Sequence, residues 1–145
     1  MQVAIKKLSE KAILPSYGSE FAAGADLYAF LDGGIVINPH ETALIPTGIA
    51  IELPVGYVGL VYARSGLATK KGLAPANKVG VIDSDYRGEV KVALHNHSNT
   101  PQEVSSGERV AQLVITPCIT AKFVERDELS ETVRGAGGFG STGSK

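Results

Sequence analysis

The sequence predicts an all-β protein, built as a sandwich, a jelly roll or a small barrel. Apolar residues alternate with other residues through the middle of the chain, for example over 49–53 and 90–94, and this period of two is typical of strands that bury one face. Candidate strands recur at the spacing of about 8–12 residues that such folds show. Helical periodicity is almost absent. These three observations together favour the all-β class.

Turn-forming Gly, Pro and Asn residues divide the chain into its expected elements. We expect strands at 35–37, 43–45, 49–53, 58–62, 90–94 and 110–116. Over 58–62 the alternation places Val58, Leu60 and Tyr62 on one face. The one candidate helix is 65–71, which Ser65 would cap and Gly72 would end.

The length of the chain, 145 residues, suits one domain with its own core. Glycine is unusually frequent, with 17 residues against a usual share of about 7%. Five of these glycines fall within 134–145, a composition that disfavours both strand and helix. We therefore expect a single β domain over 1–133 and a flexible C-terminal arm over 134–145.

Composition and charge exclude several classes of protein. The formal net charge of -1 argues against a nucleic-acid-binding surface as the main function. A single cysteine excludes a disulfide framework and a multi-cysteine metal site. No apolar run approaches the roughly 18 residues of a membrane span, and the N-terminus lacks the apolar region of a signal peptide. We expect a cytoplasmic protein that binds neither nucleic acid nor membrane.

The glycine-rich end of the chain allows two interpretations. GAGGFG at 135–140 matches G-x-G-x-x-G in form, but that dinucleotide fingerprint needs a strand before it and a helix after it. Composition alone favours a frayed terminus. However, Arg134, Ser141 and Thr142 carry groups that bind phosphate, and Phe139 can stack on a base. Such a segment would also suit a lid that closes over a ligand.

Two internal segments carry candidate chemistry, each with an ordinary structural alternative. Arg64 followed by Ser65 and Gly66 would form an anion site at the start of the short helix, or simply a helix cap beside a surface arginine. Asp83 and Asp85 lie two residues apart in a turn between strands. One of them would serve as a general base beside Tyr86, or both would simply form the turn.

Five segments, taken in order, resemble the five motifs of the trimeric dUTPases, the dUTP nucleotidohydrolases. The segments are AGADL at 23–27, ARSGLA at 63–68, GVIDSDYRG at 80–88, GERVAQL at 107–113 and RGAGGFGSTG at 134–143. The resemblance covers nearly the whole chain. Ala63 stands where the family often has Pro, and Ala136 where Ser is common; neither position supplies a reacting group.

The resemblance implies a jelly-roll-like β-barrel or sandwich with one short helix, assembled as a homotrimer with shared active sites. It implies hydrolysis of dUTP to dUMP and pyrophosphate by water attack on the α-phosphorus, with Mg²⁺ bound to the triphosphate. Each site would take the second and fourth motifs from one chain, the uracil-binding hairpin from another and the arm from the third.

The resemblance also assigns roles to individual residues. Asp83 matches the residue that orients and deprotonates the attacking water, and Tyr86 matches the aromatic ring that crowds a 2′-hydroxyl. Asp26 matches an acid that lies near the waters of the metal or near the arm arginine, without ligating the metal directly. The remaining positions match residues that contact the phosphates, uracil or the substrate more generally: Arg64, Ser65, Gly66, Asn77, Val81, Ile82, Lys91, Gln112, Arg134, Phe139, Gly140, Ser141 and Thr142.

Two alternatives share this fold. A dCTP deaminase would carry a catalytic Glu at the position of Ala93 and would lack the glycine-rich arm; without that acid, deamination is hard to run. A non-catalytic nucleotide-binding protein would be expected to have lost Asp83 or the arm, and both are present.

Overall fold

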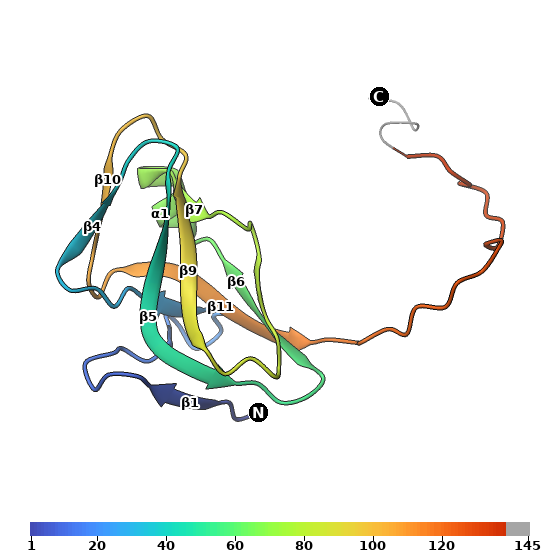
Figure 1. Ribbon diagram of the computed structural model, residues 1–145, viewed down its shortest axis with the longest axis horizontal. Coiled ribbons are helices and arrows are strands. Elements are labelled where there is room, and N and C mark those ends of the chain that lie inside the picture. Colours follow the sequence, from blue (N-terminus) through green and yellow to red (C-terminus); the bar gives the residue numbers. More distant parts are fainter. Residues whose placement is uncertain (139–145) are drawn as a thin grey trace.

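The computed structural model describes residues 1–138 (Figure 1). Within them the chain forms strands throughout and one short helix. The bounds are β1 Ala4–Lys7, β2 Ser16–Tyr17, β3 Ala25–Tyr28, β4 Gly34–Ile37, β5 Thr42–Glu52, β6 Tyr57–Tyr62, α1 Ser65–Lys71, β7 Leu73–Pro75, β8 Gly80–Ile82, β9 Glu89–Asn96, β10 Gln102–Ser105 and β11 Arg109–Pro117. The all-β prediction with one short helix is confirmed.

The strands form three antiparallel sheets. One has four strands in the order β1-β5-β9-β7, a second has five in the order β2-β3-β11-β6-β8, and β10 pairs with β4 in a third. A single core contains buried side chains from both larger sheets, such as Ile45 and Leu94 on one and Leu27 and Val110 on the other. Burying each such aliphatic side chain contributes about 1.5–3 kcal/mol, so this shared core holds the two larger sheets together.

The period-two pattern was a good guide in β9 and a poor one in β6. In β9, Val90, Val92 and Leu94 are buried while Lys91 between them is exposed. In β6, Val61 is buried and Tyr62 is exposed, so the alternation of Val58, Leu60 and Tyr62 does not mark the buried face of this strand. Gly59 in this strand lies against Leu113, Leu53 and Ile82, where a larger side chain would collide.

The predicted helix is confirmed with its bounds, but its cap is different. Arg64, in extended conformation, occupies the N-cap position, and no side chain caps the helix. The expectation that Ser65 is the cap is therefore wrong. Gly72 ends α1 in the left-handed conformation, as expected of a glycine at this position. Because Ser65 is not used as a cap, its hydroxyl remains available to a ligand.

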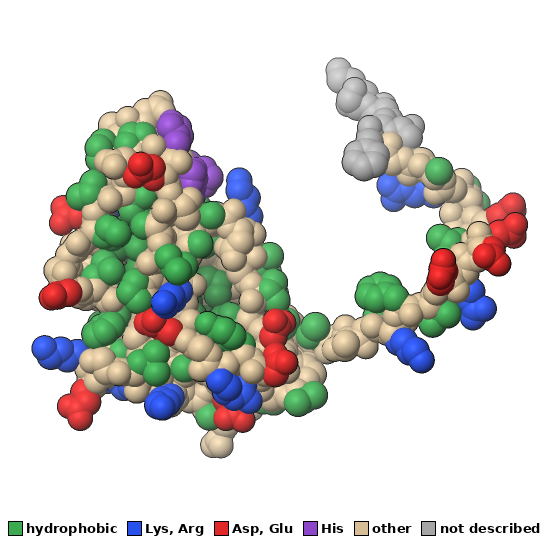
Figure 2. Space-filling view, in the orientation of Figure 1, with side chains coloured by type: hydrophobic (Ala, Val, Ile, Leu, Met, Phe, Trp, Pro, Cys, Tyr) green, Lys and Arg blue, Asp and Glu red, His purple; other side chains and the backbone are tan. Residues whose placement is uncertain are grey.

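The chain leaves the body of the protein after β11. Residues 118–136 are exposed and form no strand or helix, and Figure 1 shows them extending away from the sheets. Apolar side chains project along this stretch (Figure 2), among them Ile119, Phe123 and Leu129. The extended part thus begins well before residue 134, where we expected the arm to start. Over residues 1–138, no helix is long and apolar enough to cross a membrane.

Candidate active site

A polar hollow lies where β3, β11 and the start of α1 meet; we call it the arginine hollow. Its volume is about 220 Å³. Polar surface predominates because several of its side chains are charged or carry amides. The lining residues are Gly18, Ala22, Gly24, Asp26, Arg64, Ser65, Gly66, Arg109 and Gln112. Three of the five motif segments therefore converge on one hollow.

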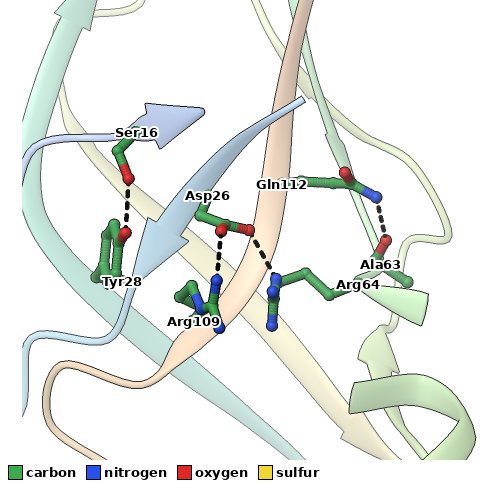
Figure 3. A network of polar contacts seen from close by, with 7 residues as sticks. All are labelled: Ser16, Asp26, Tyr28, Ala63, Arg64, Arg109 and Gln112. Carbon is green, nitrogen blue, oxygen red and sulfur yellow. Dashed lines mark hydrogen bonds and ion pairs between the residues drawn. The ribbon is translucent and has the colours of Figure 1, made fainter. Parts of the chain in front are cut away.

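Asp26 holds two arginines in this hollow (Figure 3). Arg64 Nε donates to Asp26 Oδ1 at 2.6 Å, and Arg109 Nη1 donates to Asp26 Oδ2 at 3.2 Å. The Asp26 side chain is only 11% exposed. A guanidinium has five N–H donors, so each arginine keeps further donors for an anion. Asp26 therefore orients both guanidinium groups and leaves some of their N–H donors for a ligand.

A bulge in β11 brings Arg109 and Gln112 to the same hollow. Residues three apart on a regular strand point to opposite faces. Here the register of β11 against β3 shifts between Arg109 and Ala111, which adds one residue on the β11 side. The bulge therefore turns Arg109 to the face of Gln112, in keeping with the tendency of bulges to re-aim side chains beside active sites.

Gln112 supports the loop that carries Arg64. Its Nε2 donates to the carbonyl oxygen of Ala63 at 2.8 Å (Figure 3). The side chain lies against Gly24, where an added Cβ would come within 2.6 Å of Gln112 Oε1. Ala63 contributes only its carbonyl group to this bond, so the departure from Pro at this position does not remove it. Gln112 lines the hollow and at the same time fixes its α1 side.

A second hollow, which we call the tyrosine hollow, lies beside the turn that follows β8. Its volume is about 300 Å³. Its apolar lining includes the exposed side chains of Leu44 and Val81, and Asp83 directly follows β8. The lining residues are Leu44, Val81, Ile82, Asp83, Tyr86, Glu89, Val90 and Lys91. Five predicted site residues therefore lie together here.

The polar groups of the tyrosine hollow are fixed mainly by backbone contacts. Tyr86 Oη donates to the carbonyl oxygen of Glu89 at 2.9 Å, and Tyr86 N donates to the carbonyl oxygen of Asp83 at 3.2 Å. Lys91 Nζ lies 3.5 Å from Glu89 Oε2. Asp83 and Tyr86 therefore lie on one tight turn, and the Tyr86 ring is anchored at its hydroxyl group.

Asn77 does not line the tyrosine hollow. It lies in the turn between β7 and β8, where its Nδ2 approaches Gly80 so closely that an added Cβ would be 3.1 Å away. Arg134 is also apart from both hollows, since its Nε donates to the carbonyl oxygen of Gly137 within the extended segment. The predicted site residues Phe139, Gly140, Ser141 and Thr142 lie outside the described residues.

The two hollows lie toward opposite ends of β6. Ile82 pairs with Gly59, so Asp83 lies at the level of Val58, near the start of β6. The strand runs from there to Tyr62, and Arg64 follows two residues later. At about 3.3 Å per residue, roughly 13 Å of strand separates the two levels. Within one chain, Asp83 and Arg64 therefore do not meet at one reacting group.

Several lining residues of these hollows were not among the predicted site residues, and Arg109 and Leu44 are the most informative of them. Arg109 was read only as part of the fourth motif, and the bulge that turns it inward has no signal in the sequence. Leu44 belongs to an expected strand, yet it is 59% exposed beside the tyrosine hollow. Residues 43–45 are all apolar, so the sequence did not indicate that Leu44 points away from the core while Ile45 is buried.

The geometry defines an all-β protein suited to a ligand that is anionic at one end and has an apolar face at the other, as a nucleotide does. The chain belongs to the dUTPase family, whose model matches residues 10–143. It is 51% identical over 143 residues to the deoxyuridine 5′-triphosphate nucleotidohydrolase of Nautilia profundicola, which covers 99% of both chains. The enzyme of the same name from Hydrogenobaculum is 51% identical over 145 residues, covering 100% of each.

Solved structures of dUTPases share the fold. The dUTPase of Staphylococcus bacteriophage 80alpha, solved with dUPNHPP, superposes with a TM-score of 0.89 at 30% identity, covering 98% of both chains. A mutant dUTPase from phage phi11 of S. aureus, whose structure concerns the coordination of a structural Mg(II) ion, gives a TM-score of 0.81 at 26% identity. That match covers 90% of this chain and 100% of the phage chain. The family resemblance predicted from the sequence is confirmed.

Proposed function

We propose that this protein hydrolyses dUTP to dUMP and pyrophosphate, by attack of a water molecule on the α-phosphorus. The reaction lowers the dUTP level and supplies dUMP for thymidylate synthesis. The observation that carries the proposal is the division of the family motifs into two hollows, one with the cations that phosphates need and one with a carboxylate beside an aromatic ring. The full-length relatives that are 51% identical bear the name of this activity.

Asp83 acts as the general base. Its position at the end of β8, on the lining of the tyrosine hollow, exposes the carboxylate to a bound water. An ionised carboxylate accepts hydrogen bonds only, so it orients the water with a lone pair toward the phosphorus. As the new P–O bond forms, the proton of the water moves to the Asp83 carboxylate group, and the bond to the pyrophosphate oxygen breaks.

The arginine hollow binds the triphosphate. The two guanidinium groups held by Asp26 offer their remaining N–H groups to phosphate oxygens. Ser65 and Gly66 add the first N–H groups of α1, which have no partner within the helix. Gln112 holds the loop that carries Arg64. Because these donors are already oriented, they stabilise charge on the leaving pyrophosphate without reorganisation.

The tyrosine hollow binds the nucleoside. The backbone of Val81 and Ile82 reads the edge of uracil, and Asn77, in the turn before β8 and outside the lining of the hollow, contributes from the adjacent side. Cytosine would leave these donors and acceptors unpaired. Tyr86 lies against the deoxyribose and excludes a 2′-hydroxyl. Lys91 contacts the substrate from the neighbouring strand. The apolar, exposed side chains around the hollow support this role.

The functional unit is a homotrimer with shared active sites. The separation of Asp83 from Arg64 along β6 supports this assembly, because a base must lie within hydrogen-bond reach of its water. The arginine hollow of one copy would meet the tyrosine hollow of a second. The arm of a third copy, with Arg134, Phe139, Gly140, Ser141 and Thr142, would close over the nucleotide. Cyclic symmetry makes the three sites equivalent.

Mg²⁺ enters as a partner of the substrate. Within residues 1–138, no group of three or more His, Cys, Asp or Glu is arranged to hold a metal ion. In this proposal the magnesium ion is held by triphosphate oxygens and water, which is its usual mode of binding at phosphates. When bound, the ion neutralises negative charge on the phosphates. Asp26, the carboxylate of the arginine hollow, would accept hydrogen bonds from the waters of this ion in addition to those from the two arginines.

Deamination of dCTP is a weaker candidate. The position at which such an enzyme would carry its catalytic Glu is Ala93, a half-buried residue of β9 whose carbonyl oxygen accepts a hydrogen bond from Ala76. A methyl group cannot move a proton. A purely binding protein on this fold would need no carboxylate on the tyrosine hollow, whereas Asp83 lines it.

One assay separates these functions. The purified protein is incubated with Mg²⁺ and either dUTP or dCTP, and pyrophosphate, dUMP and deaminated nucleotide are measured. We expect dUMP and pyrophosphate in equal amounts from dUTP, and little product from dCTP. Deaminated nucleotide from dCTP would support the deaminase, and no product at all would support a binding protein. The native mass, measured in parallel, should be three times that of the 15.1 kDa chain; a monomer would contradict the shared site.

A further inference from the structure

The ring of Tyr86 folds back across the backbone of its own turn. An added Cβ at Gly88 would lie 2.6 Å from Tyr86 Cζ and 2.9 Å from Cε2, and nearer still to the phenolic oxygen. Real Cβ atoms do not approach other atoms so closely, because their van der Waals shells would overlap. The observed position of the ring is therefore open only to a chain with glycine at residue 88.

The phenolic end of the ring is also anchored. Tyr86 Oη donates to the carbonyl oxygen of Glu89 at 2.9 Å. Glu89 is itself tied to the body, since its Oε1 accepts a hydrogen bond from Gly48 N at 2.9 Å. A tyrosine that is 45% exposed on a turn would otherwise have several side-chain rotamers open to it. Here the phenolic end of the ring is hydrogen-bonded and also lies close to the backbone of Gly88.

Discrimination between nucleotides that differ by one hydroxyl group depends on a rigid contact surface. A hydrophobic surface that can shift accommodates an extra hydroxyl and rejects it weakly, so rigidity of the supporting residues determines selectivity. We propose that Gly88 is a specificity-determining positioning residue, which holds the Tyr86 ring where it excludes the 2′-hydroxyl of ribonucleotides. This inference rests on the proposed function, in which Tyr86 lies against the sugar.

The substitution Gly88→Ala tests the proposal. The backbone of Gly88 lies outside the left-handed region, so Ala can adopt it, and the collision with the ring is the main consequence. We expect Gly88→Ala to displace the ring and to raise the ratio of kcat/KM for UTP to that for dUTP by at least about tenfold. An unchanged ratio, with both rates lower, would make Gly88 merely structural and overturn the proposal.

Two further variants test whether Gly88 acts through the ring. In a Tyr86→Ala background there is no ring to hold, so adding Gly88→Ala should leave the UTP to dUTP ratio unchanged within about twofold. The same increase in that background would overturn the proposal. Tyr86→Phe removes the anchor without adding an atom and should raise the ratio severalfold. If melting curves show that Gly88→Ala is unfolded, Tyr86→Phe decides, and an unchanged ratio overturns the proposal.

A control in the same turn completes the test. Asp85 is exposed and does not line the tyrosine hollow, so Asp85→Ala should leave the ratio as it is in the natural sequence. An equal increase in Asp85→Ala would show that any change in the turn loosens selectivity, which would also overturn the role of Gly88. Failure of the proposed function is seen separately, because the unmodified protein would then hydrolyse neither nucleotide.

Discussion

The two hollows hold their functional side chains by different physical means. In the arginine hollow, side chains hold other side chains: a nearly buried carboxylate orients two guanidinium groups, and an amide supports the loop that carries one of them. In the tyrosine hollow, the backbone holds the side chain: a carbonyl oxygen anchors the ring, and a glycine makes room for it.

The difference agrees with the role that we propose for each hollow. Phosphates carry charge that changes during the reaction, so cations with spare donors suit them. A sugar is selected by its shape, so a ring on a fixed backbone suits it. Charge substitutions should therefore act mainly at the arginine hollow, while changes of volume should act at the tyrosine hollow. Asp83, an acidic residue on the tyrosine hollow, is the exception because we propose that it accepts the proton of the attacking water.

The largest effect is expected at Asp83. Asn keeps the shape of the side chain but cannot accept a proton, so Asp83→Asn should lower the kcat for dUTP by about 10²–10⁴. Binding of a non-hydrolysable dUTP analogue should persist. Asp85→Asn is the matched control, since this carboxylate lies in the same turn outside the hollow, and it should keep nearly full activity. Near-normal turnover in Asp83→Asn would place the base elsewhere.

Removal of the arm should have the next largest effect. A chain that ends at Val133 loses Arg134 and the rest of the fifth motif, and we expect kcat/KM for dUTP to fall by at least about 10²–10³, the usual cost of losing charge-stabilising donors. Both hollows belong to the body, so the melting temperature and native mass should change little.

A shorter truncation provides the control for the arm. Removing only residues 144–145, which follow the fifth motif, should leave hydrolysis unchanged. If the chain that ends at Val133 keeps full activity, the frayed-terminus interpretation of the arm is correct. If it loses thermal stability instead, the arm is a structural strap between subunits. Comparing steady-state rates with melting curves separates these outcomes.

Asp26→Asn tests the arginine hollow directly, because the Asp26 side chain holds its two arginines. Asn removes the charge that pairs with Arg64 and Arg109. Charged hydrogen bonds of this kind contribute about 1.5–3 kcal/mol, so we expect kcat/KM for dUTP to fall by roughly tenfold to a hundredfold.

Two measurements distinguish an effect of Asp26→Asn on the arginine hollow from an effect on the tyrosine hollow or on charge in general. The ratio of UTP to dUTP turnover should stay as it is in the natural sequence, because the tyrosine hollow is untouched; a changed ratio would contradict the independence of the hollows. Asp127→Asn, which alters an exposed carboxylate beyond β11, is the control for charge alone and should have little effect.

The sequence predicted whatever depends on local pattern. The alternation in β9 and the span of α1 were confirmed because each is governed by neighbouring residues: period-two burial in one, and a glycine stop in the other. The family motifs likewise predicted most residues of both hollows. The short strands β1, β2, β3, β7, β8 and β10 were missed, because a few residues carry too little pattern to reveal a strand that tertiary pairing creates.

Features that depend on register or on close approach could not be predicted. The bulge that turns Arg109 toward Gln112 comes from how β11 pairs with β3. The place of Gly88 beneath the Tyr86 ring depends on how the turn folds back. In both cases the residue type was visible in the sequence, but its neighbour in space was not.

The smallest effect is expected at a histidine outside both hollows. His97 follows β9, with its ring 4.5 Å from that of His95. Desolvation lowers the pKa of His97 below its ordinary value of 6.5, and the positive charges of His95, Lys78 and His40 lower it further. The folded protein therefore binds a proton at His97 less readily than the unfolded chain does. Neutral His97 contributes stability at higher pH, and this stability is lost as the pH falls through and below about 6.5, because protonation then favours the unfolded chain.

His97→Asn removes that contribution, and melting curves between pH 7.5 and 5.5 measure the change. Carboxylates also titrate as the pH falls, so the quantity of interest is the difference between the variant and the natural sequence. We expect the variant to lose less of its melting temperature over this interval, by no more than about 4 °C, because His97 is exposed and its charge interactions are screened. Hydrolysis of dUTP at pH 7.5 should not change, since His97 lines neither hollow. A variant that loses as much melting temperature as the natural sequence would show that the histidine cluster does not govern stability, and a lower rate at pH 7.5 would mean that the end of β9 is coupled to one of the hollows.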